Sequence, residues 1–305
     1  MTSTMARDGG SRAWGEPSAE TEKQGEKAGI HPPDREIRTE AGAVSSVPAS
    51  HKSWAGPWAG RLWPVLFWLA VWQTGSLVLA QPLLLPSPAD ALLRLADLAG
   101  TAPFWRAVLR SSGRILGGFA LGCAGGILLA VPSARFPAVR RLLDPAVTAA
   151  KAVPVASFVI LALVWLNSRS LAVFIAALMA LPPVYLGVLE GIGTADAEDK
   201  DLLEMARIFR MPLWAQIQAV YLPRVLPAFR TAVSLSLGLC WKAGVAAEVI
   251  GLPQGSLGER LYTAKVYFLT ADLFAWTAAI VALSALSGRA AGWVLDFAAA
   301  RLGID

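Results

Sequence analysis

Few side chains in the apolar part of this 305-residue chain are suited to covalent chemistry. Both histidines, His31 and His51, lie near the N-terminus, so the long apolar part has no histidine to act as a catalytic base or a metal ligand. Cys123 and Cys240 each stand inside an apolar run without a neighbouring cysteine or histidine, and we interpret them as small buried hydrophobic residues. We therefore expect no catalytic residue and no metal site.

The sequence also lacks the loop that binds nucleoside triphosphates. No lysine in the chain follows a glycine, which excludes the phosphate-binding pattern GxxxxGK[ST]. We expect the chain to carry no cofactor of its own, and any ATP that drives its activity must be used by a separate subunit.

Two ionisable residues, Lys242 and Glu248, interrupt the apolar run at 231–250. Charges at membrane depth are costly and usually face a cavity or a partner. On a helix, six residues separate the two side chains by about 120° and about 9 Å, so they are poor partners for each other. Both are candidates for a solute path, in which the lysine would favour an anionic solute. Alternatively, Lys242 pairs with another helix or extends to the interface, and Glu248 lies at the outer interface.

The elements that hold these residues are expected to cross a membrane. The chain is 55% hydrophobic and only 16% charged. Up to Arg61 it has eight basic and eight acidic residues and few large aliphatic ones, so residues 1–60 are predicted to be a disordered tail. The net charge of +5 therefore arises after residue 61, where basic residues flank apolar runs. This pattern does not indicate nucleic-acid binding.

Apolar runs near the length that crosses a bilayer, about 20 residues, predict six transmembrane helices. The runs are continuous and do not alternate as the strands of a membrane barrel would. We therefore expect an all-α transmembrane domain over residues 61–305, with spans at about 62–80, 115–131, 152–166, 171–189, 231–250 and 273–292.

Glycine recurs at about four-residue spacing along the second predicted span, at Gly113, Gly117, Gly118, Gly122 and Gly126. Small residues on one face of a helix allow another helix to approach closely. This pattern predicts a packing seam, either inside the chain or across a dimer.

The charges of the short loops indicate the orientation. If the tail is cytoplasmic, the loops on its side carry more lysines and arginines than the opposite loops. Because cytoplasmic loops are the richer in Lys and Arg, we expect both termini on the cytoplasmic side.

One charged, helix-prone segment at 196–230 separates two apolar runs. It contains Glu-Met-Ala at 204–206, Arg-Met-Pro at 210–212 and Tyr-Leu-Pro at 221–223. This series of short motifs resembles the EAA loop of the permease subunits of ABC importers. From about residue 110 onward the chain is similar to the sulfonate/nitrate/taurine branch, through the sequences at 112–119 and 246–251 and Leu-Pro-Ser-Pro at 85–88.

The resemblance implies a type I importer permease with a core at about 110–292, in the inner (plasma) membrane. Such a permease passes a small solute, here expected to be anionic and similar to a sulfonate, nitrate or taurine, and forms a homodimer. Its expected partners are cytoplasmic ABC ATPase subunits, an extracytoplasmic solute-binding protein and the lipid bilayer. In the family, ATP-driven closure of the ATPases moves the permease between inward-facing and outward-facing states.

In that family the EAA loop docks into the ATPase. The resemblance places the docking in this chain at Leu203, Glu204, Ala206, Arg207, Arg210, Met211, Pro212, Leu222 and Pro223. Leu203, Ala206 and Ile208 are expected to form a small apolar knob beside Glu204 and Arg207. The alternative is an amphipathic helix that lies on lipid headgroups.

The loop departs from the family pattern at two positions. Met205 replaces the usual second alanine, and Arg210 stands where the family normally has a glycine that makes the turn between two short helices. We expect Pro212 to break the helix instead, because proline lacks an N–H and disfavours a helical Met211.

Two other functions are compatible with an apolar chain. A membrane-embedded enzyme that modifies lipids is disfavoured, because the loops carry no catalytic constellation. A proton- or sodium-coupled carrier is disfavoured as well, because such a carrier has no use for an EAA loop.

Overall fold

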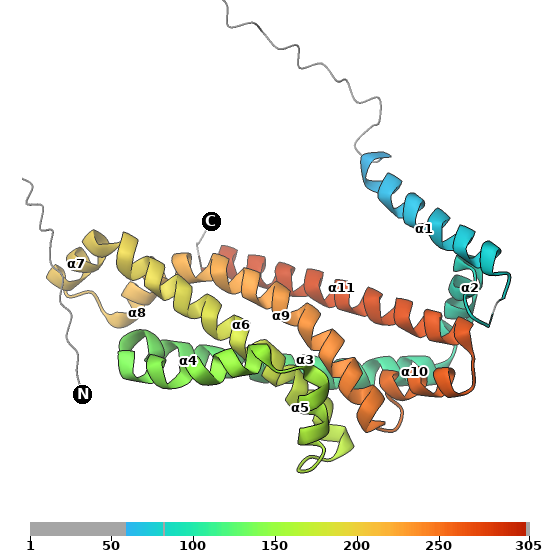
Figure 1. Cartoon of the computed structure of the whole chain (residues 1–305). Coiled ribbons are helices and arrows are strands. Elements are labelled where there is room, and N and C mark those ends of the chain that lie inside the picture. The colour runs from blue at the N-terminus through green and yellow to red at the C-terminus, as the bar shows by residue number, and fades with distance from the viewer. Residues whose placement is uncertain (1–58, 82, 303–305) are drawn as a thin grey trace, which may run out of the picture. The chain divides into compact units, whose positions relative to one another are not determined.

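The computed structural model describes residues 59–81 and 83–302, where it consists of helices and turns without a strand. The prediction of an all-α fold is confirmed. Nearly all of the predicted tail, residues 1–58, lies outside the described residues. The helices in Figure 1 are α1 (Ala59–Leu79), α2 (Pro88–Ala99), α3 (Ala102–Arg135), α4 (Pro137–Ala152), α5 (Val155–Ala162), α6 (Ser168–Glu198), α7 (Lys200–Ile208), α8 (Leu213–Gln216), the π-helical turn η1 (Ile217–Tyr221), α9 (Leu222–Gly251), α10 (Leu257–Val266) and α11 (Thr270–Arg301).

Helices α3 and α6 pack at close range because glycines of α3 face α6. A Cβ atom at Gly122 would lie 2.5 Å from the carbonyl oxygen of Ala177, and one at Gly126 would lie 2.9 Å from the side chain of Val184. Gly118 meets the backbone of α6 at similarly short range. The predicted glycine seam therefore forms inside the chain. Gly113 and Gly117 do not belong to it, since a Cβ at either position would have open space within 4 Å.

Helix α9 also packs closely on α6 and contacts α11. A Cβ at Gly187 would lie 2.8 Å from the Cβ of Ala232. The indole N–H of Trp241 on α9 donates to Ser287 Oγ on α11, at 2.8 Å. These contacts place α6 and α9 at the centre of the bundle, with the largest buried apolar side chains between the long helices.

The predicted number of six spans is not confirmed. In the part of the chain that the structure describes, four helical stretches are long and apolar enough to cross a membrane: Ala102–Arg135, Ser168–Glu198, Leu213–Gly251 and Thr270–Arg301. The apolar stretch Trp63–Leu79, where the first span was expected, is shorter.

The expected span at 152–166 is not a single helix. Helices α4 and α5 meet at an angle of 103°, and together they make at most one broken span. The break falls at Val153 and Pro154, where the backbone is extended. Proline has no N–H to continue the helix and disfavours a helical residue before it, which explains the position of the break.

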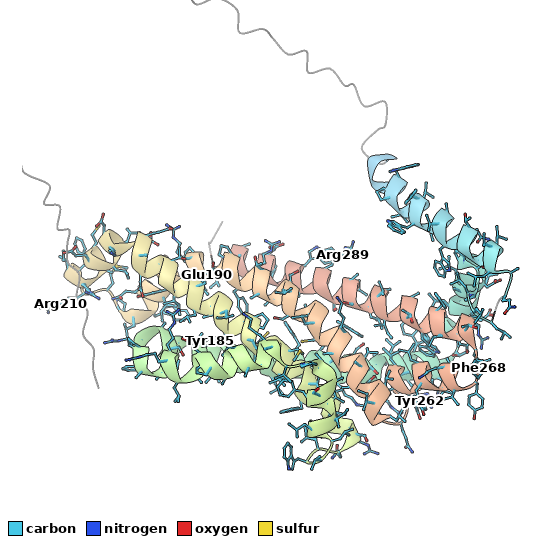
Figure 2. The ribbon with its side chains drawn as sticks, viewed as in Figure 1. Tyr185, Glu190, Arg210, Tyr262, Phe268 and Arg289 are labelled. Carbon is cyan, nitrogen blue, oxygen red and sulfur yellow. The ribbon has the colours of Figure 1, made fainter. Side chains whose placement is uncertain are left out.

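The connecting elements gather at the two ends of the long helices. Figure 1 shows α7 and α8 at one end and α2 and α10 at the other. Figure 2 shows Arg210 at the first end and Tyr262 and Phe268 at the second. At the second end, α2 is held to α11 by the guanidinium of Arg94, which donates to both carboxylate oxygens of Asp272.

Candidate functional site

The turn after α7 keeps the shape that a glycine normally makes, although Arg210 occupies the position. Arg210 has a φ of 50°, in the left-handed region. Its N–H donates to the carbonyl of Arg207 (3.1 Å), and the N–H of Met211 donates to the carbonyl of Ala206 (2.9 Å). This pair of hydrogen bonds is the Schellman arrangement that ends many helices.

Pro212 does not end the helix, contrary to the expectation from sequence. Helix α7 ends at Ile208, before proline could affect its hydrogen bonds. Pro212 instead precedes α8 as its N-terminal flanking residue, with a φ of −62° and a ψ of 149°. The local hydrogen bonds around Arg210 stop the helix first.

The residues of the expected apolar knob lie in different environments. Ala206 is buried and Leu203 is half-buried, so of the three apolar residues only Ile208 is exposed. Glu204 and Arg207 are exposed, as are Met211 and Pro212. The apolar surface of the turn is instead formed by Ile208, Phe209, Leu213 and Trp214, which are 71%, 72%, 77% and 69% exposed. We call these four residues the α7–α8 surface.

Sequence reasoning missed three residues of the α7–α8 surface: Phe209, Leu213 and Trp214. A signal for them was available, because large apolar residues directly flank a turn in an otherwise charged segment. Such a patch on a surface loop indicates an interaction site.

Leu222 and Pro223, the end of the motif, lie in the first turn of α9 and are half-buried. They follow η1, in which the N–H of Leu222 donates to the carbonyl of Ile217 and so skips one residue more than in an α-helix. Pro223 cannot donate a backbone hydrogen bond, and a widened turn accommodates its ring. The motif therefore ends on the helix that enters the bundle.

The base of α9 is tied to the junction between α6 and α7. Arg224 donates from Nε to Asp199 Oδ2 at 2.8 Å and from a terminal nitrogen to Asp199 Oδ1 at 3.0 Å. Its other terminal nitrogen lies 3.1 Å from Glu198 Oε2. The hydrogen bond from Arg224 lowers the pKa of the Asp199 carboxyl below its usual range, so this carboxyl is ionised at neutral pH.

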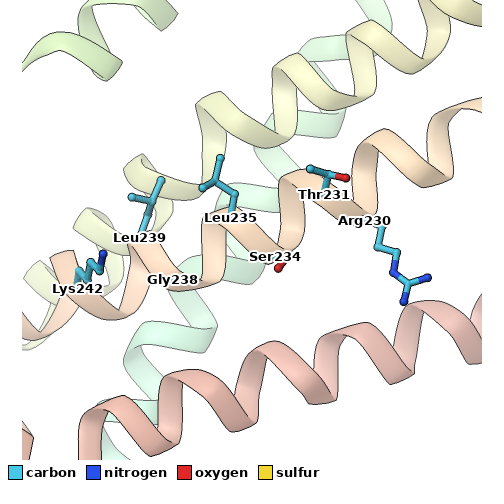
Figure 3. A pocket seen from close by; sticks show the side chains of 7 residues that line it. All are labelled: Arg230, Thr231, Ser234, Leu235, Gly238, Leu239 and Lys242. Carbon is cyan, nitrogen blue, oxygen red and sulfur yellow. The ribbon is translucent and has the colours of Figure 1, made fainter. Parts of the chain in front are cut away.

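Helix α9 carries a hollow of about 610 Å³ on the face that Figure 3 shows. Polar residues recur along this face at nearly every turn, and the lining consists of Arg230, Thr231, Ser234, Leu235, Gly238, Leu239 and Lys242. Arg230 and Lys242 stand at its two ends, about 18 Å apart along the helix axis. The hollow presents the charge of Lys242 and the hydroxyl groups of Thr231 and Ser234 to a small solute.

The two cations of the hollow differ in their pairing. In Figure 3 the side chain of Arg230 points toward α11, where its guanidinium lies 2.7 Å from Asp296 Oδ1. Lys242 is exposed and makes no ion pair with any residue that the structure describes. Its charge therefore remains available to the hollow.

A second hollow of about 630 Å³ adjoins the first. It lies between α9, α6 and the bend of α4 and α5, and it shares Thr231, Leu235 and Leu239 with the first. Lys151 and Glu190 also line it, so the combined space is bordered by charged groups on three helices.

Glu248, the other candidate for the solute path, does not line either hollow. It is fully buried and accepts hydrogen bonds from Ser111 (2.6 Å), Arg114 (3.1 Å) and the N–H of Gly258 (3.3 Å). Ser111 in turn accepts from the N–H of Leu257 at 2.9 Å. This network joins α3, α9 and the start of α10.

Within the described ranges, no group of three or more His, Cys, Asp or Glu side chains could hold a metal ion.

Comparison with known proteins gives one family match and several relatives. Residues 122–303 match the family described as "Binding-protein-dependent transport system inner membrane component". The chain is 29% identical over 240 residues to a putative aliphatic sulfonates transport permease protein of Bacillus subtilis (strain 168), covering 78% of this chain and 84% of the relative. It is 31% identical over 204 residues to the corresponding protein of Escherichia coli (strain K12), covering 66% and 76%.

A third relative is the taurine transport system permease protein of Escherichia coli (strain K12). It is 28% identical over 229 residues, which cover 72% of this chain and 80% of the relative. The family match covers more than half of the chain and all of α6 through α11. It excludes the lipid-modifying enzyme and the ion-coupled carrier. This chain belongs to the family of inner membrane components of binding-protein-dependent transport systems, and it is a multi-pass permease subunit of an ABC importer, not an enzyme.

Proposed function

We propose that two copies of this permease form the path for a small anionic solute, with the α9 hollows of both copies facing each other. The hollow places Arg230 and Lys242 on a helix that crosses the membrane. Charges at this depth are unfavourable in contact with lipid. A second copy would cover them and enclose a shared space, which supports a homodimer.

The proposed solute class follows from the charge of the hollow and from the relatives. Two of the relatives are named for aliphatic sulfonates and one for taurine. Sulfonate groups carry negative oxygen atoms that accept hydrogen bonds from Lys, Arg and hydroxyl groups. We propose that an extracytoplasmic binding protein delivers a solute with such a group to the hollow.

The α7–α8 surface is the proposed docking site for a cytoplasmic ATPase subunit, which would bind and hydrolyse the ATP. Its four exposed apolar side chains stand beside the charged residues Glu204 and Arg207. An apolar patch with a polar rim suits a groove on a protein partner. This surface, at the position of the EAA motif, is the observation that carries the proposal. Of the other predicted loop residues, Arg210, Met211 and Pro212 shape the turn, and Leu222 and Pro223 begin α9.

The orientation follows from the docking. The loop that contains α7 must lie in the cytoplasm to meet an ATPase, which agrees with the excess of lysine and arginine in the loops on that side. Both termini, including the tail at 1–60, are then cytoplasmic, and residues 61–305 form the permease domain of the cell membrane.

Reversal of one charge tests the docking. Glu204→Arg should leave the permease in the membrane but weaken its association with the ATPase by about 2 kcal/mol or more, about 30-fold. Solute-stimulated ATP hydrolysis should be lost. Association is measured by co-purification of the two subunits, and hydrolysis by phosphate release.

Asp144→Arg is the matched control, because Asp144 is an exposed carboxylate on α4 outside the proposed surface. It should retain association and hydrolysis. Unchanged association in Glu204→Arg would refute docking through α7.

A further inference from the structure

One residue, Asp199, joins three helices at the base of the bundle. It follows the last residue of α6 and precedes the first residue of α7. Its N–H donates to the carbonyl of Ala195 in α6, and its carbonyl accepts from the N–H of Leu203 in α7, at 3.1 and 2.9 Å. Its carboxylate holds Arg224 of α9 by two parallel hydrogen bonds. A planar, two-bond pair fixes orientation as well as distance.

A second hydrogen bond lies one turn away and joins η1 to α6. The hydroxyl of Tyr221, the last residue of η1, donates to Asp196 Oδ1 of α6 at 2.9 Å. The widened turn η1 lies between α8 and Arg224 along the chain, and Tyr221 is its last residue. The pair of Asp199 and Arg224 therefore connects α9 to the start of α7 directly, and Tyr221 adds a contact from η1 to α6.

Beyond these hydrogen bonds, the backbones of α6 and α9 are in close contact. A Cβ at Gly191 would lie 2.5 Å from the Cα of Val225, which follows Arg224 directly. One helical turn further on, Gly187 packs against Ala228 and Ala232 in the same way. Backbones in such close contact move together, since packed interiors resist small deformations.

The hollow begins close to this rigid contact. Arg230, at the near end of the hollow, lies six residues after Arg224, about 9 Å along the same helix. A displacement of the base of α9 should therefore reach the hollow lining, because α9 remains helical from Arg224 to Arg230, with Pro227 inside the helix.

We infer that Asp199 and Arg224 are positioning residues that transmit a movement of α7 to the solute-lining face of α9. This inference rests on the proposed docking of an ATPase on the α7–α8 surface. The ion pair lies partly in solvent and exposed pairs add little to stability. The pair connects α7, which belongs to the proposed docking surface, to α9, which lines the hollow. Its position therefore suits the transmission of a movement better than stabilisation of the fold.

The test follows the accessibility of the hollow in the complete complex. Ser234→Cys, introduced with Cys123→Ala and Cys240→Ala, places one reactive thiol in the hollow. Its rate of modification by a charged, membrane-impermeant thiosulfonate is measured with and without MgATP in the assembled permease–ATPase complex. We expect MgATP to change the rate about tenfold in this parent, as a population shift between two states would.

Asp199→Asn and Arg224→Gln should each reduce the MgATP response severalfold while the ATPase still co-purifies and hydrolyses ATP. The charge exchange Asp199→Arg with Arg224→Glu should restore most of it. Arg94→Gln is the matched control, because Arg94 and Asp272 form the same kind of pair at the other end of the bundle. Their side chains are 42% and 15% exposed, against 43% and 11% for Arg224 and Asp199. This control should keep the response.

Several results would overturn the inference. They are a normal MgATP response in either single variant, a charge exchange that responds no better than the single variants, or an equal loss in Arg94→Gln. Loss of ATPase association in the single variants would also overturn it, because the pair would then only shape the docking surface. A parent complex that does not assemble would instead refute the proposed function, and the inference with it.

Discussion

At the scale of single residues, Arg210 adopts a backbone conformation that normally favours glycine. The turn after α7 requires a left-handed backbone, which glycine adopts without strain and arginine does not. The two hydrogen bonds of the turn hold Arg210 there with a φ of 50°. The loop shape therefore survives the substitution, although the turn carries a conformational strain.

This strain predicts that Arg210→Gly stabilises the loop by about 1 kcal/mol. The thermal unfolding midpoint of the purified permease should rise, and association with the ATPase should persist. Arg210→Val serves as the opposite control, because a β-branched residue is still less suited to a positive φ. A lower midpoint for Arg210→Gly than for Arg210→Val would contradict this account.

At the same scale, Lys242 and Glu248 of α9 lie in different environments. They lie six residues apart on one helix, yet one lines a hollow and the other is buried in a hydrogen-bonded network. Periodicity predicts that they point in different directions. It does not predict which direction faces the core.

We expect Lys242→Met to reduce uptake of labelled taurine by whole cells while permease level and ATPase association stay normal. The reason is that the substitution removes the unpaired positive charge from the hollow. Lys242→Arg keeps the charge and should retain more uptake than Lys242→Met. Equal and normal uptake in both variants would show that Lys242 has only a structural role.

At the scale of elements, close contact between long helices depends on a few glycines. The seam between α3 and α6 uses Gly118, Gly122 and Gly126, whereas Gly117 on the same helix faces open space. Two neighbouring glycines in one sequence pattern therefore have different roles, which only the packing distinguishes.

The prediction for this seam compares Gly122→Leu with Gly117→Leu. Overpacking at Gly122 should cost about 1–3 kcal/mol or more and lower the yield and thermal midpoint of the folded permease. Gly117→Leu should change neither by much. Both quantities can be measured by fluorescence-detected size-exclusion chromatography after heating. Similar losses in the two variants would mean that α3 and α6 do not meet as described.

At the scale of the whole molecule, the proposed coupling depends on which elements share a side of the membrane. Helices α7 and α8 lie at one end of the long helices, and α2 and α10 lie at the other (Figure 1). If α7 faces the cytoplasm, α10 and the residues before it face outward. There they are available to the binding protein.

Single cysteines test this arrangement after replacement of Cys123 and Cys240. Cysteines at Ser18 and Asp196 should react with a membrane-impermeant maleimide only from the cytoplasmic side, and one at Gln254 only from the outside. Labelling of position 196 from the outside would overturn the proposed coupling, because a loop on that side cannot contact a cytoplasmic ATPase.

The sequence by itself determined the membrane class, the helical fold and the family, because long apolar runs and the motif around Glu204 are local properties of the chain. It did not determine the break at Pro154, where α4 and α5 meet at 103° and only the eight-residue helix α5 remains within the expected span. Nor did it reveal the burial of Glu248, because the charges and hydroxyls that satisfy a buried carboxylate come from other helices.

Only the tertiary structure shows that Arg224 pairs with Asp199, which lies 25 residues earlier in the chain. Helical periodicity states only which residues share a face of one helix. Which faces meet is decided by packing between helices, here by glycines that let α3, α6 and α9 approach closely. For that reason the candidate loop could be located from sequence, whereas its exposed surface, its connection to α9 and the hollow beyond it required the assembled bundle.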